Sequence, residues 1–184
     1  KNGRQARCQA PSEAESRMTR VGIVTISDSR SAGSRADTTT ALIRRLVEEA
    51  GYTVGETAMI PDDAQQIEAR LIEMADRLAL GLLLTTGGTG LGPRDVTPEA
   101  TRGVIDREVP GLAEAMRAVT AAQHPMAWLS RGIAGLRGRT LIVNLPGSPR
   151  AVEECLRVLI PLLAHALSMI AGDSHGSAAT VAHH

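Results

Sequence analysis

The feature that most constrains the fold of this chain is a regular alternation of short apolar runs with amphipathic helical stripes. Strand signals fall at residues 21–26, 53–60, 80–85 and 140–144, and apolar residues recur at helical spacing between them. The first run is β-branched and apolar nearly throughout, which is typical of a strand buried on both faces. Strands separated by helices favour right-handed β-α-β units and a mostly parallel sheet. The sequence therefore predicts an α/β fold.

The alternating pattern occupies residues 20–172, and we expect it to form one domain. Residues 1–19 are polar and show no apolar period, and residues 173–184 are small and polar, so a flexible tail is expected at each end. The first segment lacks the apolar region of a secretory signal. No apolar run reaches the roughly 18 residues of a membrane span. We therefore expect a cytoplasmic protein that does not cross a membrane.

The charge balance and the scarcity of aromatic and cysteine residues exclude several classes of function. Lys plus Arg and Asp plus Glu both number 20, which gives a formal net charge of zero. No overall basic field attracts nucleic acid, and with 1% aromatic residues the chain has little material for base-stacking platforms. The two cysteines, Cys8 and Cys155, are too few for a four-cysteine zinc site or a disulfide scaffold. Nucleic acid is not an expected partner.

The densest functional signal is the glycine-rich run from Thr85 to Glu99, which follows the third predicted strand. Its four glycines allow the backbone to approach a ligand closely, so that several amide N–H groups can point at one oxyanion. Thr97, as a hydroxyl cap, and Pro98 predict the start of a helix, whose dipole also favours an anion. The run lacks the Gly-Lys-Ser/Thr ending of a P-loop, and Pro93 replaces the third glycine of the dinucleotide fingerprint. An anion site and a purely structural turn both remain open.

Two carboxylates, Asp62 and Asp95, fall at the sheet edge where ligands bind in such folds. Beside a phosphate they would only add repulsion unless a cation lay between them, and Mg²⁺ bridges carboxylate and phosphate oxygens in this way. Alternatively, Asp62 or Asp63 caps the next helix, and Asp95 forms a turn with Thr97. The spacing alone leaves metal binding and capping open.

Polar loops also follow the first and last predicted strands, at Ser27–Arg30 and Asn144–Pro149. Each is a common kind of strand-to-helix loop, but with the glycine-rich run they would enclose a polar crevice. Asp37 is expected to be a helix N-cap. Cys155 falls in an apolar stripe and is expected to be a buried thiol rather than a nucleophile. His124 has no carboxylate or serine partner nearby in the sequence.

These motifs resemble those of the molybdopterin-binding domain of molybdenum cofactor biosynthesis. The resemblance rests on the run Thr85–Glu99 and on shorter pieces in the family's order and spacing: Ser27-Asp28, Pro61-Asp62, Leu129-Ser130-Arg131 and Asn144–Pro149. The domain occurs in bacterial molybdopterin adenylyltransferases, in MoaB-type proteins, in the G domain of gephyrin and in the plant molybdenum insertion protein. The resemblance implies a three-layer α/β/α fold over about residues 20–172 and, usually, a homotrimer.

The resemblance also implies an activity and its site residues. The family reaction is the Mg²⁺-dependent transfer of adenylate from ATP to molybdopterin, which releases pyrophosphate. Asp62 and Asp95 match the family's functional aspartates, with catalytic and metal-binding roles. Molybdopterin-binding positions correspond to Thr86, Gly87, Gly88, Thr89, Gly90, Ser130, Asn144, Pro146, Gly147 and Ser148. Nucleotide-binding positions correspond to Ser27, Asp28, Gly33 and Asp37.

Two other roles within the family stay open at this point. A MoaB-type protein would bind molybdopterin with little or no adenylyl transfer, although the intact Asp62 and Asp95 favour the enzyme. A scaffold role is not expected, because the extra domains that such proteins carry are not seen in this sequence. The expected partners are molybdopterin, ATP, further copies of the chain and a molybdenum insertion protein that would receive the product.

Overall fold

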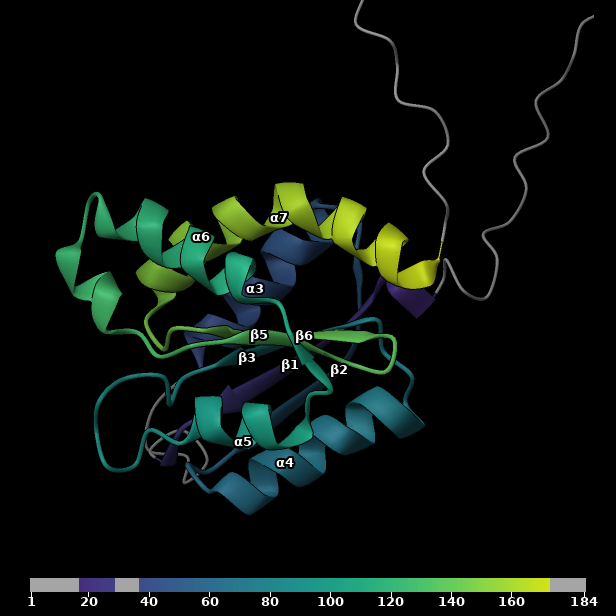
Figure 1. Cartoon of the computed structure of the whole chain (residues 1–184), viewed down its shortest axis with the longest axis horizontal. Coiled ribbons are helices and arrows are strands. Elements are labelled where there is room, and N and C mark those ends of the chain that lie inside the picture. The colour runs from purple at the N-terminus through teal and green to yellow at the C-terminus, as the bar shows by residue number, and fades with distance from the viewer. Residues whose placement is uncertain (1–16, 29–36, 173–184) are drawn as a thin grey trace, which may run out of the picture.

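The computed structural model describes residues 17–28 and 37–172 and has a six-stranded sheet at its centre (Figure 1). The strands are β1 (Arg20–Ile26), β2 (Thr53–Ile60), β3 (Leu82–Thr86), β4 (Arg107–Glu108), β5 (Ala134–Arg137) and β6 (Thr140–Leu145). They lie in the order β2-β1-β3-β6-β5-β4. The first four in this order are parallel, and β5 and β4 add an antiparallel edge. The predicted mostly parallel sheet is confirmed.

Helices cover both faces of the sheet. On one face lie α3 (Thr38–Glu49), α6 (Pro110–Ala121) and α7 (Pro149–Ala171), and on the other lie α4 (Ala64–Ile72) and α5 (Thr97–Val104) (Figure 1). The π-helix η1 (Glu73–Arg77) continues α4, and the 3-10 helix η2 (Pro125–Leu129) follows α6. Because successive strand residues point to opposite faces, Ile23 enters the core under α3, α6 and α7, whereas Val24 enters the core under α4 and α5. The expected three-layer α/β/α architecture is confirmed.

Local sequence signals set the starts of three helices. The carboxylate of Asp37 caps α3 by accepting hydrogen bonds from the amides of Thr39 at 3.2 Å and Thr40 at 3.0 Å. Asp63 caps α4 and Ser148 caps α7 in the same manner. Each cap satisfies amide groups that have no partner inside the helix. The capping role predicted for Asp37 is confirmed, and of the two candidates before α4 it is Asp63 that forms the cap.

Three features differ from the sequence-based expectation. Thr97 does not cap α5; the helix begins at Thr97 itself, and its hydroxyl donates to the Gly87 carbonyl across the preceding loop at 2.9 Å. β4 and β5 were not predicted, because two and four residues are too few to show a strand period. Met18, in the expected N-terminal tail, is 6% exposed and packs into the core. Residues 1–16 and 173–184 lie outside the described residues.

The helix α7 is long and apolar enough to cross a membrane, by length and composition only. It is the one such helix in the described ranges, with 23 residues and a mean hydropathy of 1.6 over its most apolar window. One of its faces, which includes Val152, Leu156 and Leu159, is buried against the sheet and the helices α3 and α6. Its exposed face carries ion pairs such as that of Arg157 with Glu153 at 2.7 Å. The packing of this face therefore accounts for part of the apolar character of α7, since 28% of its most apolar window is buried.

Candidate active site

The carboxyl ends of the parallel strands bring the predicted loops to one edge of the sheet. Ile26 at the end of β1 pairs with Ile60 at the end of β2, and Thr86 of β3 lies between Thr25 of β1 and Leu145 of β6. The loops that follow begin at Ser27, Pro61, Gly87 and Pro146. Ligands of open α/β sheets bind at this edge. The polar crevice predicted from the sequence falls at this edge.

The glycine-rich loop after β3 has its carbonyl groups fixed by the protein. The carbonyls of residues 87–90 all accept hydrogen bonds. Thr97 donates to the first two, from its hydroxyl at 2.9 Å and from its amide at 3.1 Å. Arg131 donates to the other two, from its amide at 2.9 Å and from its Nε at 2.7 Å. The remaining nitrogens of Arg131 reach Glu99 and the carbonyl of Asp95, so this arginine ties the loop to the start of α5.

The amide groups of the same loop are open. The N–H groups of Gly88, Thr89 and Gly90 donate to no acceptor within the part of the chain that the structure describes. Thr89 is 6% exposed, and a backbone amide that is buried without a partner is costly. Successive open amides with their carbonyls fixed behind them form a rigid donor set for an oxyanion. This geometry favours an anion site over a purely structural turn.

Glycine is required at two positions of this loop. Gly87 has φ +103°, and a Cβ there would lie 2.2 Å from the Ile26 carbonyl oxygen. Gly88 has φ +61°, and a Cβ there would lie 2.3 Å from Thr97 Oγ1 and 3.1 Å from Asp62 Oδ1. Any side chain would strain the backbone and push the loop away from β1 or from the carboxylate. The two glycines therefore set the distance between the open amides and Asp62.

Asp62 is linked to Asp28 across the ends of β2 and β1. The Asp28 amide donates to Asp62 Oδ2 at 2.9 Å, and the Asp62 amide donates to Asp28 Oδ1 at 3.0 Å. Arg94, the arginine of the glycine-rich run, binds Asp28 Oδ2 at 2.6 Å. Burial raises the pKa of Asp62; the hydrogen bond from Asp28 opposes this shift, and the charges of Asp28 and Asp95 increase it. The carboxylate of Asp62 is therefore incompletely compensated by the protein.

Asp95 closes the end of the glycine-rich loop. Its Oδ2 accepts the Gly92 amide at 2.8 Å, so it forms a turn, although with Gly92 and not with the expected Thr97. The described residues contain no group of three or more His, Cys, Asp or Glu side chains that could hold a metal ion. Mg²⁺ is usually held by one or two carboxylates together with substrate phosphates and water. Asp62 and Asp95, two oxygen donors whose charges repel, fit such an open site.

The loop after β6 packs against the glycine-rich loop. The Thr86 hydroxyl donates to the Pro146 carbonyl at 2.6 Å. Asn144 is 2% exposed, and its Nδ2 donates to the hydroxyls of Thr85 and Thr101, both at 2.9 Å, while its Oδ1 accepts a backbone amide at 3.2 Å. The amide of Asn144 therefore holds β3, α5 and β6 together. Its predicted contact with molybdopterin stays a prediction.

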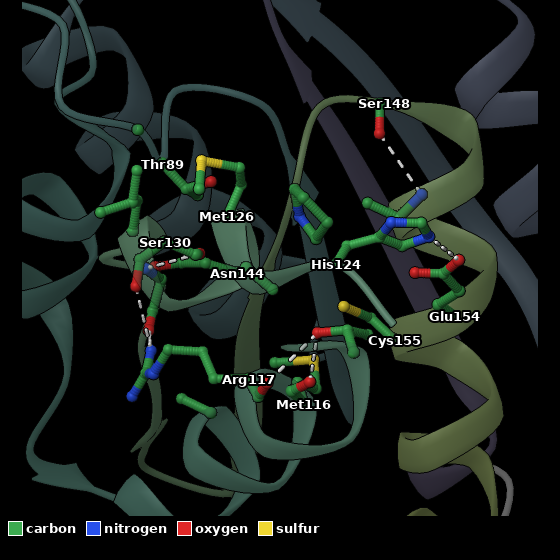
Figure 2. Close-up of a pocket in the computed structure, with 18 of the residues that line it drawn as sticks. Thr89, Met116, Arg117, His124, Met126, Ser130, Asn144, Ser148, Glu154 and Cys155 are labelled. Carbon is green, nitrogen blue, oxygen red and sulfur yellow. Dashed lines mark hydrogen bonds and ion pairs between the residues drawn. The ribbon is translucent and has the colours of Figure 1, made fainter. Parts of the chain in front are cut away.

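A pocket of about 380 Å³ opens between α6, η2 and the start of α7 (Figure 2). Six predicted molybdopterin positions line it: Thr89, Gly90, Ser130, Asn144, Pro146 and Ser148. Thr86, Gly87, Gly88 and Gly147 lie outside its lining, as do Asp62 and Asp95. The crevice thus has an organic-sized pocket on the α6 and α7 side and a carboxylate group on the α4 and α5 side. The open amides lie between these two parts.

The grouping of several pocket residues could not be predicted from the sequence, because they come from segments far apart in the chain. His124 Nε2 lies 3.4 Å from Glu154 Oε1, so α7 supplies the carboxylate that the sequence around His124 lacks. Arg150 Nε lies 3.1 Å from the same oxygen. Arg117 Nη1 donates to the Gly132 carbonyl at 2.8 Å and so holds the segment before β5. The packing of α6 against both α7 and η2 brings these side chains into one pocket.

Cys155 lies in this pocket and is 6% exposed, which confirms the predicted buried thiol. Burial and, to a lesser extent, the charge of Glu154 raise the pKa of the Cys155 thiol to about 12. The thiol therefore stays protonated at neutral pH, and nucleophilic catalysis by Cys155 is not expected.

The positions predicted for the nucleotide come together only in part. Ser27 and Asp28 lie at the end of β1 beside Asp62, where the Ser27 amide donates to the Ile60 carbonyl at 3.0 Å. Asp37 is the N-cap of α3. Gly33 falls in residues 29–36, outside the described residues.

A mostly parallel sheet with open amides, two carboxylates and a pocket at one edge defines an α/β protein whose site suits a small organic anion. The sequence of this protein also matches a known family. The chain belongs to the family described as "Probable molybdopterin binding domain", whose sequence model matches residues 22–165.

Individual relatives agree with the family match. The chain is 36% identical over 157 residues to the molybdopterin adenylyltransferase of Helicobacter pylori J99, which covers 83% of this chain and 88% of the relative. It is 42% identical over 156 residues to the molybdenum cofactor synthesis protein cinnamon of Drosophila melanogaster, and it spans 26% of that longer protein. A crystal structure of the molybdopterin biosynthesis enzyme MoaB from Thermus thermophilus has a TM-score of 0.80 at 53% identity, covering 84% of this chain and 97% of that chain.

Proposed function

We propose that this protein transfers adenylate from ATP to molybdopterin and releases pyrophosphate. The observation that carries the proposal is the row of open amides at Gly88, Thr89 and Gly90, between the pocket and the two carboxylates of Asp62 and Asp95. A phosphate at these amides would have its organic group in the pocket and its free oxygens toward the carboxylate side. The name of the Helicobacter pylori relative supports the same chemistry.

The reaction needs no general base on the protein. The terminal phosphate of molybdopterin is an anion at neutral pH, and one of its oxygens attacks the α-phosphorus of ATP while the bond to the β-phosphate oxygen breaks. The main task of the protein is to bring two anions together in line. The open amides of residues 88–90 donate to the attacking phosphate, and Thr97 and Arg131 keep them in place by binding the carbonyls behind. Donors fixed in this way need little reorganisation during the reaction.

Asp62 and Asp95 would hold the Mg²⁺ that we propose for this reaction. When bound, the ion would neutralise charge on the phosphates and on the departing pyrophosphate. The raised pKa of Asp62 supports this role, because burial in the first place, and the charges of Asp28 and Asp95 in the second, make its negative charge unfavourable without a cation. Arg94 adds an exposed positive charge at the same edge, where it binds Asp28.

A pyrophosphate-release assay with molybdopterin, ATP and Mg²⁺ tests the proposal. Wild-type protein should release pyrophosphate. Asp95→Asn should lose about 100-fold or more of this activity and keep its molybdopterin affinity within a few fold. The asparagine retains an oxygen for the Gly92 amide but lacks the charge. Asp76→Asn, at a surface ion pair with Arg137, is the matched control and should keep its turnover.

The outcomes separate the claims. Equal turnover by the Asp95→Asn variant and the wild type would contradict the role of Asp95. No pyrophosphate from the wild type would contradict the enzymatic function. Molybdopterin binding without pyrophosphate would point to the second candidate, a MoaB-type binding protein, which the 53% identity to the Thermus structure favours.

We propose further that the protein acts in the cytoplasm as a homotrimer and passes adenylyl-molybdopterin to a molybdenum insertion protein. Exposed apolar side chains on η2 support self-association: Met126 is 71%, Trp128 60% and Leu129 49% exposed. A cluster of this kind commonly marks a protein interface.

A further inference from the structure

The pocket wall holds one carboxylate that the proposed mechanism does not use. Among the residues that line the pocket, Glu154 is the only Asp or Glu, and its side chain is 18% exposed. The wall around it is largely apolar and includes Met116, Ala151 and Cys155. A charged group in such surroundings loses hydration and needs partners that restore it. The contacts of Glu154 therefore show what the pocket is built to accept.

The two oxygens of Glu154 have unequal partners. Arg150 Nε at 3.1 Å and His124 Nε2 at 3.4 Å both reach Oε1. Within the described residues, no hydrogen bond reaches Oε2. Figure 2 shows the Glu154 carboxylate reaching from α7 toward the pocket, beside His124 and Cys155. The hydrogen bond from Arg150 fixes the side chain by one oxygen, and the other oxygen is left to accept N–H groups from a ligand.

We propose that Glu154 recognises the 2-amino-4-oxopyrimidine edge of the pterin ring of the substrate. This inference rests on the proposed function, because that function places a pterin in the pocket. The edge carries a ring N–H and an exocyclic amino group side by side, and both donate in the same direction. Oε2 has two lone pairs, so this one oxygen can accept both N–H groups in charge-assisted hydrogen bonds. The apolar wall then receives the faces of the flat ring, as in many small-molecule sites.

The positions of the two ends of the pocket support this assignment. Thr89 and Gly90, whose amides are open, line the same pocket as Glu154. The substrate carries its phosphate on one side of the ring system and its aminopyrimidine edge on the other. With the phosphate at the glycine-rich loop and the ring edge at Glu154, one molecule satisfies both groups. Glu154 would thus determine ring specificity and take no part in the phosphate transfer.

Binding of two simple rings to the full chain tests the proposal. Pterin carries the amino group at C2, whereas lumazine carries a carbonyl oxygen there that would face the carboxylate. Wild-type protein should bind pterin at least tenfold more tightly than lumazine in a fluorescence titration, because a site built for an N–H donor rejects an analogue without it. Glu154→Gln, which keeps the shape but loses the charge, should reduce this preference to about threefold or less.

Two variants separate recognition from a structural ion pair. Glu153→Gln, on the neighbouring position of α7, changes a glutamate that pairs with Arg157 outside the pocket lining, and it should keep the preference. Arg150→Ala breaks the ion pair at Oε1 but spares Oε2, so it should also keep the preference for pterin. Equal loss of preference in Arg150→Ala and Glu154→Gln would mean that only the ion pair matters and would overturn the proposal. Arg150→Ala also covers the case in which the glutamine variant does not fold.

The result also stands apart from the proposed function. A wild type that prefers pterin through Glu154 but releases no pyrophosphate would leave this inference intact and contradict the adenylyl transfer. Two results would overturn the role of Glu154 alone while the wild type still releases pyrophosphate. One is a wild type with no preference between the rings. The other is a Glu154→Gln variant with the same preference and the same molybdopterin KM as the wild type. Absence of pterin binding to the wild type would also overturn it.

Discussion

At the scale of single residues, Asp62 combines a stability penalty with a proposed functional role. Its pKa is raised in the folded protein by burial and by the charges of Asp28 and Asp95. The folded state therefore binds the proton more tightly than the unfolded state does. Stability falls as the pH rises through the interval between the unfolded and the folded pKa, and the penalty persists at higher pH. A bound cation would remove this penalty.

Replacing Asp62 should consequently stabilise the protein while harming its proposed activity. Asp62→Asn removes the charge and keeps an oxygen that accepts the Asp28 amide. We expect a melting temperature about 1–3 °C above that of the wild type at pH 7, and this difference should shrink when the pH falls below about 4. Thermal unfolding followed by circular dichroism at both pH values measures this. A melting temperature below that of the wild type at pH 7 would contradict the assigned charge repulsion.

The residue scale also shows which functional groups a sequence reveals. Asp62 and Asp95 could be placed at the sheet edge from the sequence, because each follows a strand or a glycine-rich run, so its position relative to the sheet is local information. Glu154 and His124 could not be predicted as a pair, since 30 positions separate them and the packing of α6 against α7 and η2 joins them. The role of Arg131 could not be predicted, because its contacts are mainly with backbone carbonyls, which leave no sequence pattern.

At the scale of elements, the glycine-rich loop depends on its two close approaches. Gly87 lies against the carbonyl of Ile26, and Gly88 lies against Thr97 and Asp62. The loop could be predicted as a ligand loop from its composition and its place after β3. Its direction could not, because the contacts that turn its carbonyls inward come from Arg131 and Thr97. The short strands β4 and β5 could not be predicted for a related reason: β5 is stabilised by pairing with β6 and β4 by pairing with β5, which local sequence does not record.

A methyl group at Gly87 should destabilise this loop. Gly87→Ala places a Cβ 2.2 Å from the Ile26 carbonyl oxygen at a φ of +103°, and we expect the free energy of unfolding to fall by about 3 kcal/mol or more. Gly138→Ala is the matched control, since Gly138 also has positive φ, +53°, but nothing lies within 4 Å of its Cβ position. The control should lose only about 1 kcal/mol.

Urea unfolding of both variants gives the two free energies. Similar losses for Gly87→Ala and Gly138→Ala would show that the loop does not press against β1 as described. The difference between the two losses in the free energy of unfolding measures the effect of the close approach of residue 87 to Ile26, because both variants include the cost of positive φ.

At the scale of the whole molecule, one sheet edge joins an acidic group, a row of amides and a pocket. The parallel order of β2, β1, β3 and β6 makes this possible, because it places the ends of all four strands side by side. The sequence predicted this edge, since alternating strands and helices admit few topologies. The volume and lining of the pocket could not be predicted from the sequence, because they depend on how α6 packs against η2 and α7.

The proposed assembly makes a prediction at the same scale. Multi-angle light scattering at micromolar concentration should give a particle of three chains, compared with 19.4 kDa for one chain. The exposed Trp128 and Met126 are the kind of side chain that association would cover. A particle of one chain at all concentrations measured would contradict the proposed trimer.

We expect the amides of Gly88, Thr89 and Gly90 to bind the phosphate of the pterin substrate. A crystal structure of the wild-type protein with molybdopterin bound measures this directly. We predict phosphate oxygens within about 3 Å of at least two of these amides and the ring in the pocket between α6 and α7. A pterin bound at another surface, with these three amides still free of it, would contradict the account.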